Sequence, residues 1–233
     1  KAIDIGKSKD FGIVTIKVDG FDFEVAQFRA DGKYIDGRRP EEIKIVQSFK
    51  DDAGRRDFTI NSMGLDKDGN LIDHFDGKKA IKNKIIQTVG NPYDRFEEDR
   101  LRMLRLVRFS NRLDFDIHPE AKQAVKDNAH RLTDISAERI HDELMKMASQ
   151  DGSKFADALI LMDKVGILKI ILPEVVDLKN YQETKRHHPE AHLFGPGRVW
   201  DHVIHALRQN KIADPIINLA ILFHDIAKNK STY

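Results

Sequence analysis

The sequence contains no cysteine, a single tryptophan and no long apolar run. Without cysteine it can form neither disulfides nor thiolate metal sites, so histidines and carboxylates would have to hold any metal. No segment approaches the roughly 18 apolar residues that a membrane-spanning helix needs, and residues 1–6 do not read as a secretory signal. These absences favour a globular cytoplasmic protein with no membrane partner.

Net charge is also nearly absent, at +1, although 33% of the 233 residues are charged. A polyanion would therefore bind to a local basic patch and not through the overall charge. The hydrophobic content of 40% is sufficient to bury the core of one large or two small domains.

The first third of the chain predicts strands. Residues 12–18 and 21–28 are rich in β-formers, and Asp19-Gly20 between them is a strong hairpin signal. Alternation along the second run places Phe21 and Phe23 on one face and Glu24 on the other. Residues 29–42 predict a polar loop, 48–63 a helical segment, and 68–73 the turn and second strand of a short hairpin.

Helices are expected from about residue 96 onward, with strands confined to the first third. The expected helices cover 96–109, 120–128, 136–148, 154–165, 199–210 and 214–227, and residues 187–198 predict a linker. The pattern predicts an α+β fold. Its expected divisions are a small β-sheet head with helices at 1–92, a helical neck and body at 93–180, and a further helical domain at 181–233.

Four arginines and an acidic pair occupy residues 98–109, which predict one helix carrying a charged stripe. One interpretation is a solvated face supported by ordinary Glu-to-Arg pairs. The other is a base-recognition surface. Asp99 offers acceptors and Arg102 offers parallel donors, a combination that matches the pairing edges of cytosine and adenine.

A second charged group is Arg55-Arg56-Asp57, followed by Asn61. Guanidinium groups match phosphate oxygens, and a carboxylate accepts from a ribose hydroxyl. The alternative interpretation is a surface ion cluster.

Together these stretches resemble the class II tRNA nucleotidyltransferase and bacterial poly(A) polymerase family. Residues 55–63 resemble its RRDFTINAM signature, differing at Ser62, and residues 98–102 resemble its EDxxR motif. Residues 23–29 and 36–40 resemble the strand and loop that precede the first signature. The four motifs occur in the family order, and the resemblance covers roughly residues 10–170.

The resemblance implies template-independent addition of C or A, from CTP or ATP, to the 3′ end of tRNA, with Mg²⁺ as cofactor. It assigns the phosphates to Arg56, the ribose 2′-hydroxyl to Asp57 and the base to Asp99 with Arg102. The full nucleotide-binding set that it implies is Arg55, Arg56, Asp57, Asn61, Glu98, Asp99, Arg102, Arg105 and Arg108.

One departure from the family pattern concerns the catalytic carboxylates. The family carries its metal-binding Asp pair and a glycine-rich turn before the hairpin, and this sequence has neither, so we expect a truncated start. The D-x-E spacing of Asp22 and Glu24 makes Glu24 a candidate acidic residue, with an exposed strand face as the alternative.

A histidine pattern near the end of the sequence suggests a separate metal site. His202 and the later pair His224-Asp225 resemble the start of the HD phosphohydrolase superfamily, whose distant Asp would lie beyond Tyr233. This resemblance implies a truncated HD domain with a second divalent metal. Two rival functions follow: an HD phosphohydrolase or phosphodiesterase on an RNA-binding scaffold, and a noncatalytic protein that binds RNA or nucleotides.

Overall fold

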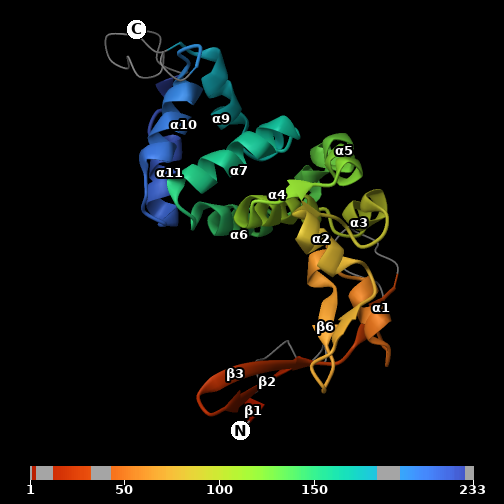
Figure 1. Ribbon diagram of the computed structural model, residues 1–233. Helices are drawn as coiled ribbons and strands as arrows, with labels where there is room; N and C mark the ends of the chain where they lie inside the picture. The colour runs from red at the N-terminus through yellow and green to blue at the C-terminus, as the bar shows by residue number, and fades with distance from the viewer. Residues whose placement is uncertain (1, 4–12, 33–42, 183–194, 229–233) are drawn as a thin grey trace.

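The computed structural model describes residues 2–3, 13–32, 43–182 and 195–228. The molecule is elongated and curved, with a small β-sheet at the N-terminal end and a stack of helices at the other (Figure 1). The predicted α+β class is confirmed. A sheet-containing head is followed by a body made almost entirely of helices.

The predicted hairpin is present as β2 (Ile13–Val18) and β3 (Phe21–Ala26), with Val18 paired to Phe21. Asp19 and Gly20 form the two-residue turn, and both have positive φ, at 50° and 85°. Such a turn matches the right-handed twist of the strands, which is why this dipeptide predicts it. Strand β1 (Ala2–Ile3) adds to the free edge of β2.

One face of this sheet is apolar and exposed. Cross-strand partners lie on the same face of a sheet, and here apolar residues face each other directly, as in Val14 with Val25 and Val18 with Phe21. Phe21 is 70% exposed and Phe23 52% exposed. Within the described residues, therefore, this face of the hairpin has no apolar cover.

The predictions for residues 29–63 were wrong in two places. Strand β4 (Arg29–Asp31) replaces the start of the expected loop and pairs with β5 (Ile43–Ile45), while 33–42 lie outside the described residues. The expected helix ends early, because α1 (Phe49–Gly54) is followed by a turn and the short 3-10 helix η2 (Thr59–Asn61). Backbone bonding explains the break, since Thr59 N donates to Gln87 O and Val89 N donates to Asp57 O.

The second hairpin is confirmed as β6 (Met63–Leu65) and β7 (Leu71–Asp73). Helix α2 (Gly77–Asn83) leads to β8 (Ile85–Ile86), which pairs in parallel with β9 (Asp116–Ile117). Strands are therefore not confined to the first third. This short parallel pair joins the head to the helical body.

The expected single helix across residues 98–109 is two helices, α3 (Pro92–Glu98) and α4 (Arg102–Leu113). Asp99 interrupts them with extended backbone, at φ −144° and ψ 105°. Its side chain accepts from Leu101 N at 3.1 Å, and its carbonyl accepts from Arg102 N at 3.0 Å. Asp99 therefore closes the turn that leads from α3 into α4, whose N-cap residue is Leu101, and the charge pattern did not reveal this turn.

The remaining predicted helices are confirmed. The last of them, expected over 214–227, is α11 and ends at Phe223. The bounds are α5 (Pro119–Asn128), η3 (Ala129–Asp134), α6 (Ala137–Ala148), α7 (Gly152–Lys164), α8 (Leu168–Ile171), α9 (Pro173–Asp177), η4 (Leu178–Asn180), α10 (Val199–Gln209) and α11 (Pro215–Phe223). Of the expected linker, residues 187–194 lie outside the described part.

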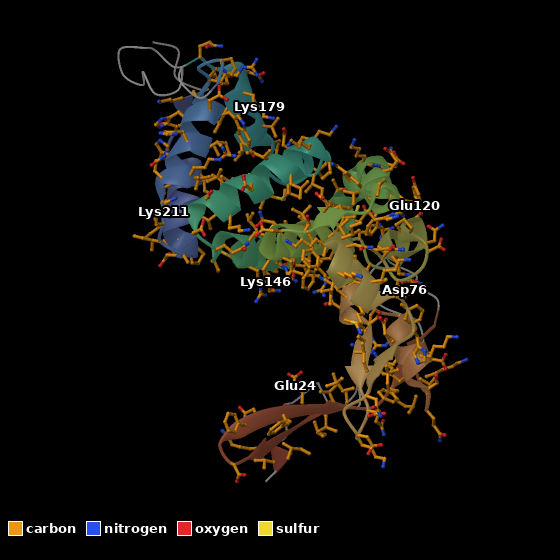
Figure 2. The ribbon with its side chains drawn as sticks, in the orientation of Figure 1. Glu24, Asp76, Glu120, Lys146, Lys179 and Lys211 are labelled. Carbon is orange, nitrogen blue, oxygen red and sulfur yellow. The ribbon has the colours of Figure 1, made fainter. Side chains whose placement is uncertain are left out.

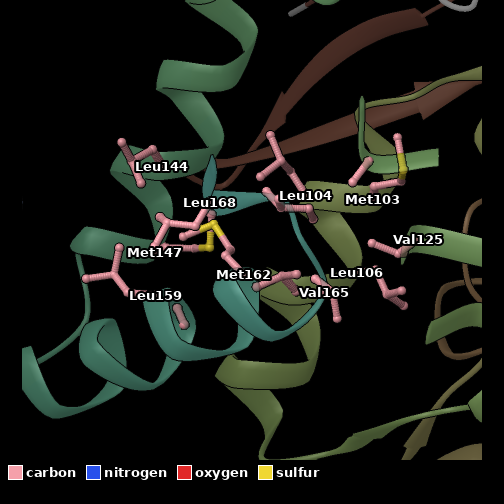
Figure 3. Packing of buried hydrophobic residues seen from close by; sticks show 14 of the residues in the cluster. Met103, Leu104, Leu106, Val125, Leu144, Met147, Leu159, Met162, Val165 and Leu168 are labelled. Carbon is pink, nitrogen blue, oxygen red and sulfur yellow. The ribbon is translucent and has the colours of Figure 1, made fainter. Parts of the chain in front are cut away.

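The hydrophobic core lies in the body, where α4 packs against α6 and α7 (Figure 3). Met103 and Leu106 from α4, Met147 from α6, and Leu159 and Met162 from α7 have no exposed surface. Burial of this apolar face holds α4 rigidly. The backbone positions of the side chains on the opposite face of α4 are therefore fixed as well.

Candidate functional site

A cavity of about 520 Å³ lies between the head and the body, a size suited to a small organic ligand. It contains all the predicted nucleotide-binding residues except Glu98 and Arg108. The residues lining it are Arg55, Arg56, Asp57, Asn61, Asp99, Leu101, Arg102, Arg105, Phe109 and Arg139. The fold therefore brings the two charged motifs together around one space, which a pair of separate surface clusters would not do.

Asp52 holds the two arginines of the first motif. Its carboxylate lies 2.7 Å from Arg55 Nη2 and 3.0 Å from Arg56 Nη2, and it accepts from the Arg29 amide at 3.2 Å. Burial opposes ionisation of Asp52, but these hydrogen bonds outweigh it and hold its pKa below the usual value. The sequence reasoning missed this residue, although its i,i+3 and i,i+4 spacing to the arginines was available as a signal.

Asp57 is oriented from two sides. Its Oδ1 accepts from Phe58 N at 2.8 Å and from Asn61 Nδ2 at 3.0 Å, and its Oδ2 lies 2.6 Å from Arg105 Nη2. Arg105 comes from α4, so this ion pair ties the head to the body across the cavity. The carboxylate presented to a ligand is consequently fixed before the ligand arrives.

Arg102 is held by acceptors behind it. Its Nη1 donates to Arg95 O at 3.1 Å and to Glu98, and its Nη2 donates to Arg55 O at 2.9 Å. Only 9% of its side chain is exposed. Glu98 does not line the cavity and therefore positions Arg102 from outside it.

Asp99 lies in the break between α3 and α4, with 19% of its side chain exposed. Arg139 Nη2 donates to both of its carboxylate oxygens, at 3.1 Å to Oδ1 and 2.9 Å to Oδ2. Arg139 belongs to α6, 40 residues further along the chain. The sequence reasoning missed it, because none of the quoted motifs links it to Asp99.

Arg108 points away from the cavity. Its Nε donates to Glu143 Oε2 at 2.6 Å, both side chains are buried, and Lys146 Nζ lies 2.9 Å from the other carboxylate oxygen. Burial opposes ionisation of Glu143, but hydrogen bonds from Lys146 and Arg108 outweigh it, so its pKa is lowered. In this structure Arg108 joins α4 to α6.

The cavity residues do not fit a divalent cation. Its two described carboxylates, Asp57 and Asp99, each face an arginine, and the other charged side chains that line the cavity are all cationic. Mg²⁺ prefers oxygen ligands, usually with one or two carboxylates. Glu24 is exposed on β3 in the projecting sheet and does not line this cavity (Figure 2).

A second cluster is formed by His202 on α10 and by His224 and Asp225 just after α11. Their potential ligand atoms all lie within 4.8 Å of one another. His224 Nδ1 lies 2.7 Å from Ile221 O, a pure acceptor, so in the neutral ring Nδ1 donates there and Nε2 is the nitrogen that can bind a metal. That Nε2 is 3.1 Å from His202 Nε2 and 3.3 Å from Asp225 Oδ2. Two imidazoles and a carboxylate converging in this way fit a divalent transition metal.

No described helix is both long enough and apolar enough to cross a membrane.

Two family descriptions match separate parts of the sequence. Residues 2–87 match the "Poly A polymerase head domain", and residues 114–178 match the "Probable RNA and SrmB- binding site of polymerase A".

The curated relatives include CCA-adding enzymes. That of Lactobacillus johnsonii is 45% identical over 161 residues, covering 69% of this chain and 40% of the relative. That of Geobacillus sp. is 38% identical over 214 residues, covering 92% of this chain and 52% of the relative. This chain thus spans about half the length of these relatives or less.

The fold is also similar to those of solved CCA-adding enzymes and tRNA nucleotidyltransferases. The Bacillus stearothermophilus CCA-adding enzyme in complex with CTP superposes with a TM-score of 0.63 at 38% identity, covering 72% of this chain and 39% of that one. A tRNA nucleotidyltransferase complexed with a primer tRNA and an incoming ATP analog superposes with a TM-score of 0.65 at 25% identity, covering 97% and 60%.

Proposed function

The chain belongs to the class II tRNA nucleotidyltransferase and bacterial poly(A) polymerase family, and from that membership we propose that it selects CTP and ATP for template-independent addition to the 3′ end of tRNA. The observation that carries the proposal is the meeting of Arg55-Arg56-Asp57 with Asp99 and Arg102 around one cavity. The relatives and solved structures named above support the same function.

Base selection rests on Asp99 and Arg102. Cytosine and adenine each carry an exocyclic amino donor, whereas uracil and guanine carry a carbonyl oxygen at the corresponding position. A carboxylate at Asp99 accepts from an amino group and repels a carbonyl oxygen. The Arg102 guanidinium donates to the neighbouring ring acceptor. One Asp/Arg pair therefore separates C and A from U and G without a nucleic acid template.

The triphosphate and the sugar are assigned to the other side of the cavity. Arg55 and Arg56, fixed by Asp52, supply donors to phosphate oxygens, and Asp57 accepts from a ribose hydroxyl. In the reaction a tRNA 3′-hydroxyl forms a bond to the α-phosphorus, the bond from that phosphorus to the bridging oxygen breaks, and pyrophosphate leaves. Mg²⁺ is the proposed cofactor, but both described carboxylates of this cavity face arginines, so its ligands would have to come from elsewhere.

Incorporation of labelled CTP and ATP into tRNA lacking its CCA end tests this function in the full-length product of the gene that encodes the chain. We expect incorporation of C, A or both, and none of U or G. Tight binding of tRNA and nucleotides without incorporation would instead support a noncatalytic binding protein. We also propose that the chain divides into a head at 1–92, a neck and body at 93–180 and an HD-like part at 181–233. A cytoplasmic location is part of the same proposal.

The assembled His202, His224 and Asp225 cluster supports a second candidate activity, metal-dependent hydrolysis of phosphate esters. We expect His224→Ala to weaken binding of Mn²⁺ at this cluster by at least about 10-fold, since losing a ligand exceeds the effect of losing an outer partner. Calorimetric titration with MnCl₂ measures it, and chelator-sensitive release of phosphate reports the activity.

The exposed His130 lies outside the cluster, so His130→Ala is the matched control and should bind Mn²⁺ as the wild type does. Equal Mn²⁺ affinity in the His224→Ala variant and the wild type would rule out a metal site at the cluster.

A further inference from the structure

We propose that the exposed lysines of α2 bind the phosphate backbone of the tRNA substrate, at a surface outside the nucleotide cavity. This surface, the α2 patch, consists of Lys78, Lys79, Lys82 and Lys84. The inference rests on the proposed action on tRNA. It adds to that proposal a surface of the head that holds the RNA while its 3′ end reaches the cavity.

Positive charge is concentrated in the α2 patch. Residues 78–84 carry four lysines, in a protein whose net charge is only +1. All four side chains are exposed, and none forms an ion pair with a carboxylate in the described parts of the chain. The cavity arginines differ, because Arg55, Arg102 and Arg105 each pair with a carboxylate. The charge of the α2 patch is therefore available to an external anion.

Two acidic residues precede α2, and neither neutralises the patch. The Asp73 carboxylate accepts from Gly77 N and Lys78 N, both at 2.8 Å, and so caps the start of the helix. Burial opposes ionisation of Asp73, but these hydrogen bonds outweigh it and lower its pKa. Asp76 is the N-cap residue and lies at the opposite end of α2 from Lys84.

The inner face of α2 packs against a wall of the nucleotide cavity. Gly77 and Ala80 are buried, and a Cβ added to Gly77 would clash with the backbone of η2. Asn61, at the end of η2, lines the cavity. Lys78 and Lys82 lie one turn apart on the outer face. The α2 patch thus lies close to the cavity, where the head meets the helical body (Figure 1).

Lys84 occupies a position that favours glycine. It is the C-cap residue of α2 and has left-handed backbone angles, at φ 53° and ψ 47°. Glycine adopts this conformation without the strain that a Cβ causes, and it is the usual residue after a helix end. Replacing Lys84 by glycine therefore removes one charge of the patch without harming the fold.

Lysines suit the RNA backbone better than the bases. An ammonium group is a compact point charge without the fixed fork of donors that arginine offers. Contacts with phosphates position a nucleic acid and carry no sequence information, as addition without a template requires. The segment that matches an RNA-binding family, residues 114–178, does not include α2. The patch is therefore a contact additional to that segment.

Fluorescence anisotropy with labelled tRNA lacking its CCA end tests the proposal in the full-length product of the gene. Binding is measured between about 50 and 200 mM KCl. We expect Lys78→Gln/Lys82→Gln to lower the slope of log affinity against log salt by about 2, one for each lysine, and to weaken binding at the lowest salt at least about 10-fold. Calorimetry should show CTP affinity within about 2-fold of the wild type, because the two lysines do not line the cavity.

Two further variants separate the patch from net charge and from folding. Lys17→Gln/Lys67→Gln removes the same charge from the head, but these lysines pair with Asp22 and Asp68, so the slope should stay as in the wild type. Lys84→Gly should lower the slope by about 1. Its urea midpoint of unfolding should stay the same or rise, because glycine relieves the left-handed strain.

The outcomes are distinct. An unchanged slope in Lys78→Gln/Lys82→Gln, or an equal fall in Lys17→Gln/Lys67→Gln, would overturn the α2 patch and leave the proposed function intact. An accompanying loss of CTP affinity would also overturn it, because the effect would then act through the cavity. Displacement by polyglutamate as effective as by unlabelled tRNA would overturn the assignment to RNA. A wild-type protein that binds no tRNA would overturn both this inference and the proposed function.

Discussion

Arg102→Ala is expected to weaken CTP and ATP binding about 100-fold and to abolish the preference for them over UTP and GTP. In the proposed function the guanidinium supplies the donors that recognise the ring acceptors beside the amino group, and hydrogen bonds that involve a charged group are stronger than those between neutral groups. The substitution also removes one of the two arginine partners of Glu98, the other being Arg95, and a donor to Arg55 O. Calorimetry with the four triphosphates measures the change, and incorporation into tRNA should fall in parallel.

Arg112→Ala is the control for this experiment. Arg112 lies on the same helix, α4, but is exposed and does not line the cavity. Its removal should leave nucleotide binding within about 2-fold of the wild type, as is usual for an exposed side chain away from a site. Near-normal selectivity in Arg102→Ala would refute the role assigned to that residue.

Glu143→Ala is expected to lower the free energy of unfolding by about 3–5 kcal/mol. Removing one partner of a buried ion pair leaves an uncompensated buried charge, here the guanidinium of Arg108 between α4 and α6. Urea unfolding at pH 7 measures the change. Asp142→Ala, which removes a 70% exposed carboxylate from the same helix, should cost less than about 0.5 kcal/mol.

The effect of Glu143 also predicts a pH dependence. Its pKa is lower in the folded protein than in the unfolded chain, so its contribution to stability is complete above the unfolded pKa and is lost as the pH falls through the folded one. The stability difference between the wild type and Glu143→Gln should therefore narrow below about pH 4. A difference that stayed constant into strong acid would contradict the assignment of the ion pair.

Local signals predicted the parts of the fold that depend on short stretches. Asp19-Gly20 predicted the turn because few dipeptides adopt two consecutive positive φ values readily. The amphipathic stretches predicted the body helices because their apolar pattern is also contained within a short stretch of sequence. The break at Asp99 could not be predicted from the charge pattern. It depends on whether the Asp99 side chain accepts a hydrogen bond from the backbone of the next residues, as it does from Leu101 N, and the charge pattern does not tell this from a continuous helix.

The candidate site was predictable where its residues fall within motifs, and not where they act through tertiary contacts. Asp57 and Arg102 were found because their residue types and order are distinctive. Arg139 was not, because its relation to Asp99 exists only once α6 packs beside α4. The same packing turns Arg108 toward Glu143 and away from the cavity, although the family resemblance placed it in the nucleotide-binding set.

Comparison of CTP with UTP tests the central claim most directly, because the two bases differ only on the edge assigned to Asp99 and Arg102, where the amino donor becomes a carbonyl oxygen and the ring acceptor N3 becomes an N–H donor. Titration of this chain should give CTP an affinity at least about 10-fold higher than UTP. In Asp99→Asn that preference should narrow, because the amide can turn its own amino group toward the carbonyl oxygen of uracil while Arg102 still favours the ring acceptor of cytosine. Equal affinities for CTP and UTP in the wild type, or an unchanged preference in Asp99→Asn, would contradict the account.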